Sequence, residues 1–139
     1  MKYLLITLLT FLSLNTITAS EEIPEFLSVG LELAIEKGSF AEALPAWYDA
    51  SPDLTKGEKF KKNVEGISKY ERKIGKPVSF EVLGVDSPIP ELQVVYIAMK
   101  HESGAYFVKL ICFRNNNNWE LKQYRYATDP TKIIPDSYY

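Results

Sequence analysis

The chain of 139 residues has one cysteine, one histidine and no Asn-x-Ser/Thr glycosylation site. A lone Cys112 cannot form an internal disulfide, so the fold must be held by core packing. Apolar neighbours predict a buried thiol there rather than a nucleophile. One histidine and scattered carboxylates provide neither a zinc-ligand spacing nor a catalytic triad. The sequence therefore predicts no metal, no cofactor and no familiar catalytic set.

Residues 1–20 have the pattern of a cleavable secretory signal. Lys2 precedes a short apolar run over residues 3–14, small residues follow, and the chain turns acidic at Glu21. We expect cleavage after Ala19 or Ser20. An uncleaved anchor helix is the alternative, but the run is too short to span a bilayer, which needs about 20 residues. We expect a periplasmic or secreted protein with no stable membrane anchor, and the missing glycosylation site favours a bacterial setting.

Residues 21–139 have the length of a single domain with one hydrophobic core. Without Lys2 this part has 15 basic and 18 acidic residues, a net charge of −3. Such a mild acidic balance argues against nucleic-acid binding.

Hydrophobic periodicity predicts helices in the first part of the chain and strands in the second. Helices are expected over 24–37 and over 55–75. Between them, a further helix is expected to begin at Ser39, whose capping-box partner would be Glu42. Pro45 should kink or break this helix. Strands are expected over 78–85, 92–100, 105–113 and 119–126, with a loop at 86–91, turns at 101–104 and 115–118, and a surface tail over 127–139. This order predicts an α+β fold, with the helices packed on a strongly curved four-stranded antiparallel sheet.

Four short motifs carry a family resemblance. They are EKGSF at 36–40, AWYDAS at 46–51, RKIGKP at 72–77 and NWEL at 118–121. With these motifs the chain resembles small exported proteins of uncharacterised function that have the cystatin-like fold of nuclear transport factor 2. The resemblance implies a cone, in which a bent sheet and helices enclose a cavity. That superfold includes isomerases, dehydratases and binding modules, so it does not decide the function.

Asp49 and Asp53 are the candidate catalytic residues, because both flank a loop beside Tyr48. A loop carboxylate at a pocket mouth could abstract a proton, and the alternative is a pair of helix caps. His101 lies beside a hairpin turn, where we expect its side chain to face water.

Aromatic residues are the candidate ligand-binding set: Trp47, Tyr48, Tyr96 and Tyr106. Their alternative role is ordinary core packing. Strands 92–100 and 105–113 are apolar on both faces, which three helices cannot cover fully. A homodimer through the sheet would cover the remainder.

Three functions follow from these features. The leading hypothesis is an exported, non-enzymatic binding module for a small apolar ligand or another exported protein. The second is a small cofactor-free isomerase or dehydratase with a pocket carboxylate. The third is an exported inhibitor or accessory subunit that acts through the basic segment 56–76, which has eight basic and three acidic residues. The alternative for that segment is a solvated helix face.

Overall fold

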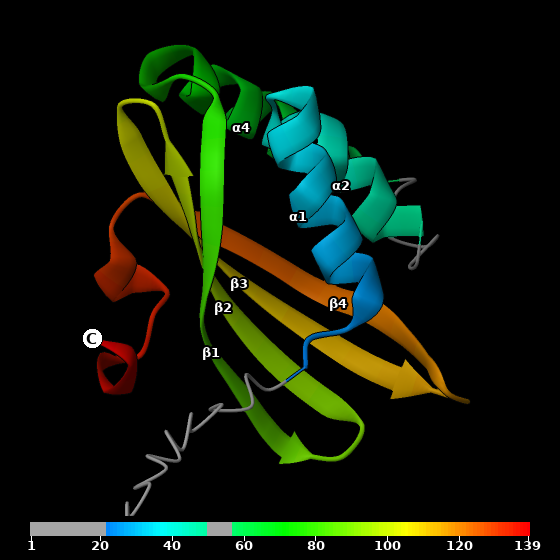
Figure 1. Cartoon of the computed structure of the whole chain (residues 1–139). Helices are drawn as coiled ribbons and strands as arrows, with labels where there is room; N and C mark the ends of the chain where they lie inside the picture. The colour runs from blue at the N-terminus through cyan, green and yellow to red at the C-terminus, as the bar shows by residue number, and fades with distance from the viewer. Residues whose placement is uncertain (1–21, 50–56) are drawn as a thin grey trace, which may run out of the picture.

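The computed structural model describes residues 22–49 and 57–139, and it has the expected α+β architecture (Figure 1). The predicted signal segment, Asp53 and the predicted start of the third helix at residues 55 and 56 lie outside these residues. In chain order the elements are α1 (Glu25–Lys37), α2 (Phe40–Asp49), α4 (Glu58–Ile74), β1 (Pro77–Ile89), β2 (Leu92–His101), β3 (Gly104–Asn115), β4 (Asn118–Ala127), and the short 3-10 helices η1 (Pro130–Lys132) and η2 (Asp136–Tyr138).

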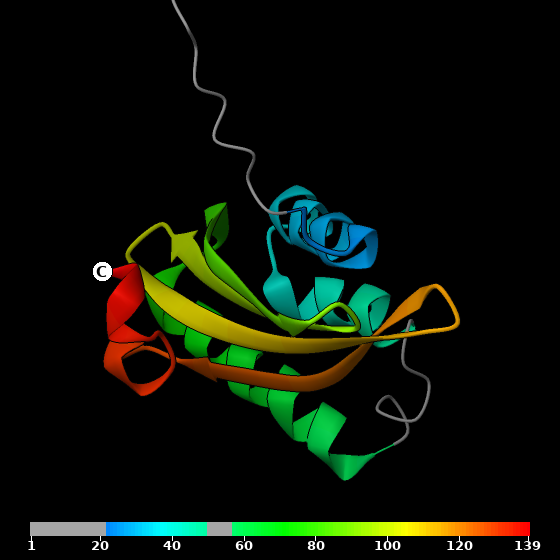
Figure 2. The same cartoon turned by 90° about the horizontal axis from the view of Figure 1, so that it is seen from below.

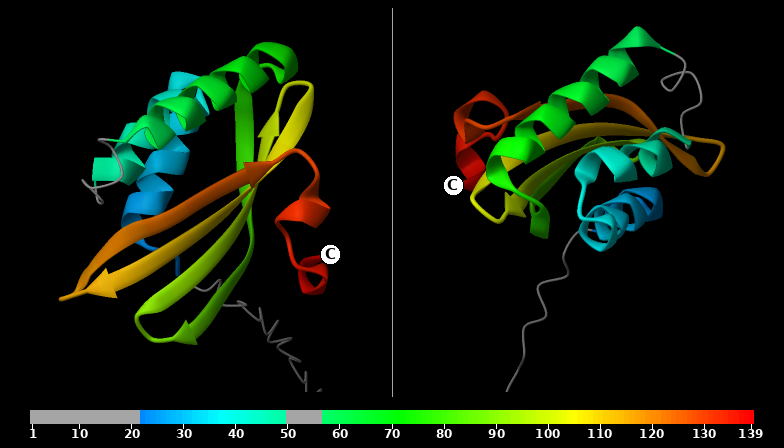
Figure 3. Two further views of the ribbon diagram at one scale, coloured as in Figure 1. Left: turned by 180° about the vertical axis from the view of Figure 1, so that it is seen from behind. Right: turned by 90° about the horizontal axis from the view of Figure 1, so that it is seen from above.

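The four strands form one antiparallel meander in the order β1-β2-β3-β4, so β1 and β4 are its edges. The helices gather on one side of the sheet, and the C-terminal tail lies on the other side of β1 (Figures 1 and 3). This confirms the predicted class and strand pairing, whereas strong curvature of the sheet stays a prediction. No helix within the described ranges has the length and apolar character to cross a membrane.

The alternation of side chains along β2 and β3 decides where the core lies. In β2 the buried side chains Val95, Ile97 and Met99 face the helices. In β3 the matching set is Tyr106, Val108, Leu110 and Cys112. Helices α1 and α2 complete this core with Leu27, Leu31, Ala34, Phe40, Leu44 and Trp47.

Helix α1 ends as the sequence predicts, but α2 begins differently. Gly38 takes a left-handed conformation (φ 66°), which a glycine adopts without strain. The predicted capping box is wrong, because the partner of Ser39 is not Glu42. The Ser39 hydroxyl and the Phe40 backbone N–H both donate to the Glu71 carboxylate of α4, at 2.7 and 2.6 Å. A residue distant in sequence therefore caps α2.

Two predictions about proline are affected by the structure. Helix α2 runs through Pro45 without the break that was one of the two alternatives there, and the kink stays a prediction. Strand β1 continues through most of the expected loop at 86–91, and only Pro90 and Glu91 form the turn. Pro88 is accommodated because β1 is an edge strand with an irregular register between Asp86 and Ile89. A proline costs little where no ladder hydrogen bond is required.

The asparagine run makes the expected turn between β3 and β4. Asn116 and Asn117 have φ of 47° and 69°, a region that asparagine tolerates better than most residues. Beyond β4, the tail packs against the sheet through the buried Ile134 and through Tyr138. The tail therefore contributes to the outer side of the sheet.

Candidate functional site

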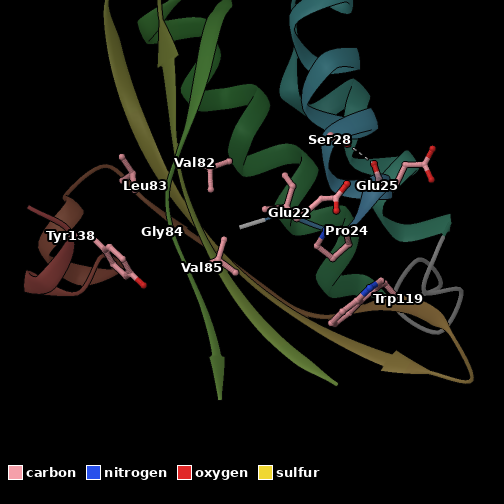
Figure 4. Close-up of a pocket in the computed structure, with 11 residues that line it drawn as sticks. Glu22, Pro24, Glu25, Ser28, Val82, Leu83, Gly84, Val85, Trp119 and Tyr138 are labelled. Carbon is pink, nitrogen blue, oxygen red and sulfur yellow. Dashed lines mark hydrogen bonds between the residues drawn. The ribbon is translucent and has the colours of Figure 1, made fainter. Parts of the chain in front are cut away.

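The largest of the five hollows described for this structure lies between the start of α1 and the edge strand β1 (Figure 4). Its volume is about 910 Å³, which is within the usual range for ligand sites. Six of its lining residues carry the argument below: Glu22, Glu25, Val82, Val85, Trp119 and Tyr138. We call this hollow the α1–β1 cavity.

An irregular register along β1 shapes the apolar wall of the cavity. Val82 pairs with Ile97 and Val85 with Val95, so both valines lie on the side of β1 that faces α1 (Figure 4). Leu83 is the extra residue of a bulge between Val82 and Gly84, and it lies on the opposite side. The cavity thus follows the edge of β1, where this strand has no neighbouring strand among the described residues.

The charged groups of the α1–β1 cavity are acidic. Glu22 and Glu25 line it, and none of its described lining residues is a lysine or an arginine. Glu25 lies in the first turn of α1, where the helix dipole stabilises a carboxylate. The site is suited to a group with positive charge and an apolar surface.

Tyr138 closes the outer side of the cavity. Its hydroxyl donates to the Asp86 carboxylate of β1, and its ring lies 5.4 Å from that of Tyr96. A Cβ atom on Gly84 would lie only 2.1 Å from the Tyr138 ring, so the glycine makes room for this contact. Sequence reasoning missed Tyr138, although an aromatic residue near the end of a proline-containing tail was the available signal.

The four predicted ligand-binding aromatics do not come together. Trp47 and Tyr106 lie in the core, both in edge-on contact with Phe40. The indole N–H of Trp47 donates to the Leu27 carbonyl at 3.0 Å. These two side chains fill the space between helices and sheet, and neither lines a described hollow.

The other two aromatics have different surroundings, although Tyr48 directly follows Trp47 in α2. Tyr48 packs against Phe60 at a ring distance of 4.6 Å, and its hydroxyl accepts from the Asn63 amide at 3.4 Å. Tyr96 lies on the face of the sheet opposite the helices, next to Tyr138 and below the Lys109 ammonium group. Only Tyr48 lines a described hollow, beside α4.

Of the two candidate catalytic carboxylates, only Asp49 lies among the described residues. It is exposed at the end of α2 and lines none of the described hollows. It therefore lacks the burial that turns a carboxylate into a general base at neutral pH.

The prediction that His101 faces water was wrong. Its side chain is fully buried, and its Nε2 atom lies 3.6 Å from the Glu71 carboxylate. Its Nδ1 atom lies 3.3 Å from the Met99 carbonyl, and its ring contacts Tyr106. The turn itself is limited to Glu102 and Ser103, so His101 is the last strand residue and shares the inward face with Met99. Hence His101 and Glu71 lie next to each other between β2 and α4, and the Nε2 atom has no hydrogen-bond partner among the described residues.

Metal and thiol chemistry have no support among the residues described. No group of three or more potential ligands comes together within the described part of the chain. Cys112 is fully buried, as expected, and burial raises the pKa of its thiol to about 12. The thiolate that a nucleophile requires is therefore disfavoured at neutral pH.

No protein-family model, curated protein or solved structure matches this chain.

Proposed function

We propose that this protein is an exported, non-enzymatic binding module whose α1–β1 cavity receives an extended segment of another exported protein. The single observation that supports this proposal is a coincidence of position. The largest described hollow runs along β1, one of the two strands with no further neighbouring strand among the described residues.

An edge strand offers backbone N–H and C=O groups to a partner chain, which can add to the sheet as a further strand. The Val82 and Val85 side chains would provide apolar contacts, while Glu22 and Glu25 would attract positive charge. The partner segment is therefore expected to alternate apolar and basic residues, because successive side chains of a strand point to opposite sides.

Trp119 provides a direct signal for this binding. It is one of two tryptophans and lines the cavity, whereas Trp47 is buried in the core. A synthetic peptide of alternating valine and lysine should shift the tryptophan emission to shorter wavelength and saturate. A peptide with glutamate in place of lysine is the matched control, and it should bind at least tenfold more weakly.

The variant Glu22→Gln/Glu25→Gln separates this site from general attraction. It should lower the affinity for the valine–lysine peptide roughly tenfold, because charge-assisted contacts contribute about 1.5–3 kcal/mol each in favourable cases. Glu32→Gln/Glu36→Gln makes the same charge change on α1 outside the cavity lining and should bind as the unmodified protein does. Equal weakening by both double variants would contradict the proposal.

A homodimer through the outer face of the sheet is a second proposal with its own observation. On that face the half-buried pairs Val94–Ile111 and Leu92–Phe113 lie across β2 and β3. The described α-helices lie on the other side of the sheet. Ile111→Lys should convert a dimer to a monomer in sedimentation experiments. A monomeric unmodified protein at micromolar concentration would exclude this proposal.

The inhibitor hypothesis depends on α4, where Lys61, Lys62 and Lys69 are exposed. Binding to an acidic partner protein would then weaken with salt, because surface charges are screened.

A further inference from the structure

A second site lies at the opposite edge of the sheet, where α4 runs beside β4 (Figures 2 and 3). Two adjoining hollows of about 150 and 360 Å³ open there. Both are lined by Asn63 of α4 and Tyr124 of β4, so they lie next to each other and are treated together. We call this pair of hollows the α4–β4 cleft.

The charged side chains that line the α4–β4 cleft are all basic. They are Lys59, Lys122, Arg125 and Lys132, and no carboxylate is among the described lining residues. Lys122 forms an ion pair with Glu120. Asp129, near Lys132, accepts hydrogen bonds from Thr131 outside the lining. The remaining cations have no carboxylate within 4.0 Å among the described residues.

Hydrogen-bond donors at the base of the cleft add to this positive charge. Tyr124 is 6% exposed, and its hydroxyl has no hydrogen-bond partner among the described residues. Burial raises the pKa of this phenol well above its usual value, so the hydroxyl keeps its proton and can donate. The Asn63 amide donates to Tyr48 with one of its two hydrogens and has the other available. An unpartnered buried hydroxyl is uncommon, and a bound water or ion is one explanation for it.

We propose that the α4–β4 cleft binds a small organic carboxylate, with the Tyr124 hydroxyl and the Asn63 amide as donors and Arg125 and Lys132 as counter-charges. The volumes of the two hollows limit the ligand to a small molecule. The Tyr126 ring and Ile133 provide apolar surface for the body of the ligand. This site is separate from the α1–β1 cavity and does not depend on the function proposed there.

Benzoate is the probe, and benzamide is its neutral counterpart of the same shape. Calorimetric titration of the purified protein at low ionic strength should show saturable binding of benzoate to one site. Benzamide should bind at least tenfold more weakly, because it has no negative charge. Equal binding of the two compounds, or no saturation by benzoate, would overturn the proposal.

Two variants locate the site. Arg125→Gln/Lys132→Gln should lower the affinity for benzoate roughly tenfold. Because both side chains are exposed, the fold should be unaffected. Lys61→Gln/Lys69→Gln removes the same charge from exposed positions of α4 outside the cleft and should leave the affinity unchanged. Equal loss in both variants would show general attraction only and would refute the site.

Tyr124→Phe tests the donor at the base of the cleft. The hydroxyl has no partner within the described structure, so its removal should leave thermal stability the same or higher. Benzoate affinity should nevertheless fall roughly tenfold, since a hydrogen bond to a charged group is lost. An unchanged affinity would overturn the role of Tyr124. Binding to anionic phosphatidylglycerol vesicles without binding to benzoate would assign the cations to a membrane surface and also overturn the proposal.

Discussion

The two edges of the sheet present opposite charge. Helix α1, beside the β1 edge, contains three acidic residues and one basic residue. Helix α4, beside the β4 edge, contains six basic and three acidic residues. The hollows repeat this difference, because the α1–β1 cavity has only carboxylates and the α4–β4 cleft only cations among their described charged lining residues.

The formal net charge of −2 therefore does not show that two separate regions have opposite charge. At physiological salt the Debye length is about 8 Å, so each edge acts on ligands close to it and little on the other. The two proposals together predict that one small protein binds a cationic partner at one edge and an anionic ligand at the other. The following experiments ask how far the two edges are independent.

Alkaline pH should cause the largest loss of stability, because it destabilises the core that both edges of the sheet pack against. Burial raises the pKa of Tyr106 and Tyr124 well above the usual value and that of Cys112 from 9.0 to about 12. Above pH 9 the unfolded chain releases protons that the folded chain retains, so stability is complete below pH 9 and falls as pH rises. Cys112 alone should lower the free energy of unfolding by about 1.4 kcal/mol per pH unit up to pH 12.

Urea denaturation at a series of pH values measures this slope. Cys112→Ala is the control, and its free energy of unfolding should fall less steeply between pH 9 and pH 10. The same slope in both proteins would show that the thiol is not buried in the folded state.

Trp47→Ala should lower the stability of the fold at both edges of the sheet together. The indole is fully buried and donates to the Leu27 carbonyl, so its removal should cost about 3–5 kcal/mol of unfolding free energy. Val29→Ala on α1 changes a 44% exposed side chain and should cost less than about 0.5 kcal/mol. Chemical denaturation compares the variants, and Trp47→Phe serves if the alanine variant does not fold. A cost below about 1 kcal/mol for Trp47→Ala would mean that the core is not built around this residue.

Gly84→Ala should affect the β1 edge alone. The new methyl group would collide with the Tyr138 ring and displace the tail, at a cost of about 1–3 kcal/mol. Hydrogen exchange should show faster opening near the C-terminus. The affinity for the valine–lysine peptide should change, whereas the affinity for benzoate should stay constant. In a Tyr138→Ala background the same substitution should cost almost nothing, because the colliding ring is absent. Equal costs in both backgrounds would argue against the Gly84–Tyr138 contact.

Gly66→Ala tests the β4 edge and should have the smallest effect. Alanine is favoured over glycine in a helix by about 1 kcal/mol, but here its Cβ atom would lie 2.3 Å from the Tyr126 hydroxyl. The two effects should nearly cancel in the unmodified protein. In a Tyr126→Phe background the collision disappears, and Gly66→Ala should stabilise by about 1 kcal/mol in thermal denaturation. Stabilisation of the same size in both backgrounds would contradict the close approach of α4 to β4.

Local patterns were sufficient for much of the fold. Alternation in residues 92–100 and 105–113 predicted two central strands, and Gly38 and the asparagine run predicted a helix end and a turn. The loop predicted at 86–91 failed because prolines were interpreted without knowledge of the sheet edge. The candidate site was predicted less well: aromatic residues were selected by type, and Trp47 and Tyr106 are part of the core.

The sequence by itself determined the α+β class, the four strands and the burial of Cys112, because these depend on periodicity over a few neighbouring residues. Only the tertiary structure decided that Glu71 caps α2, that His101 is buried beside it, and that Tyr138 packs over Gly84. It also decided that acidic and basic helices lie at opposite edges of the sheet. Each of these features joins residues distant in sequence, and periodicity shows which side of an element is buried but not which partner covers it.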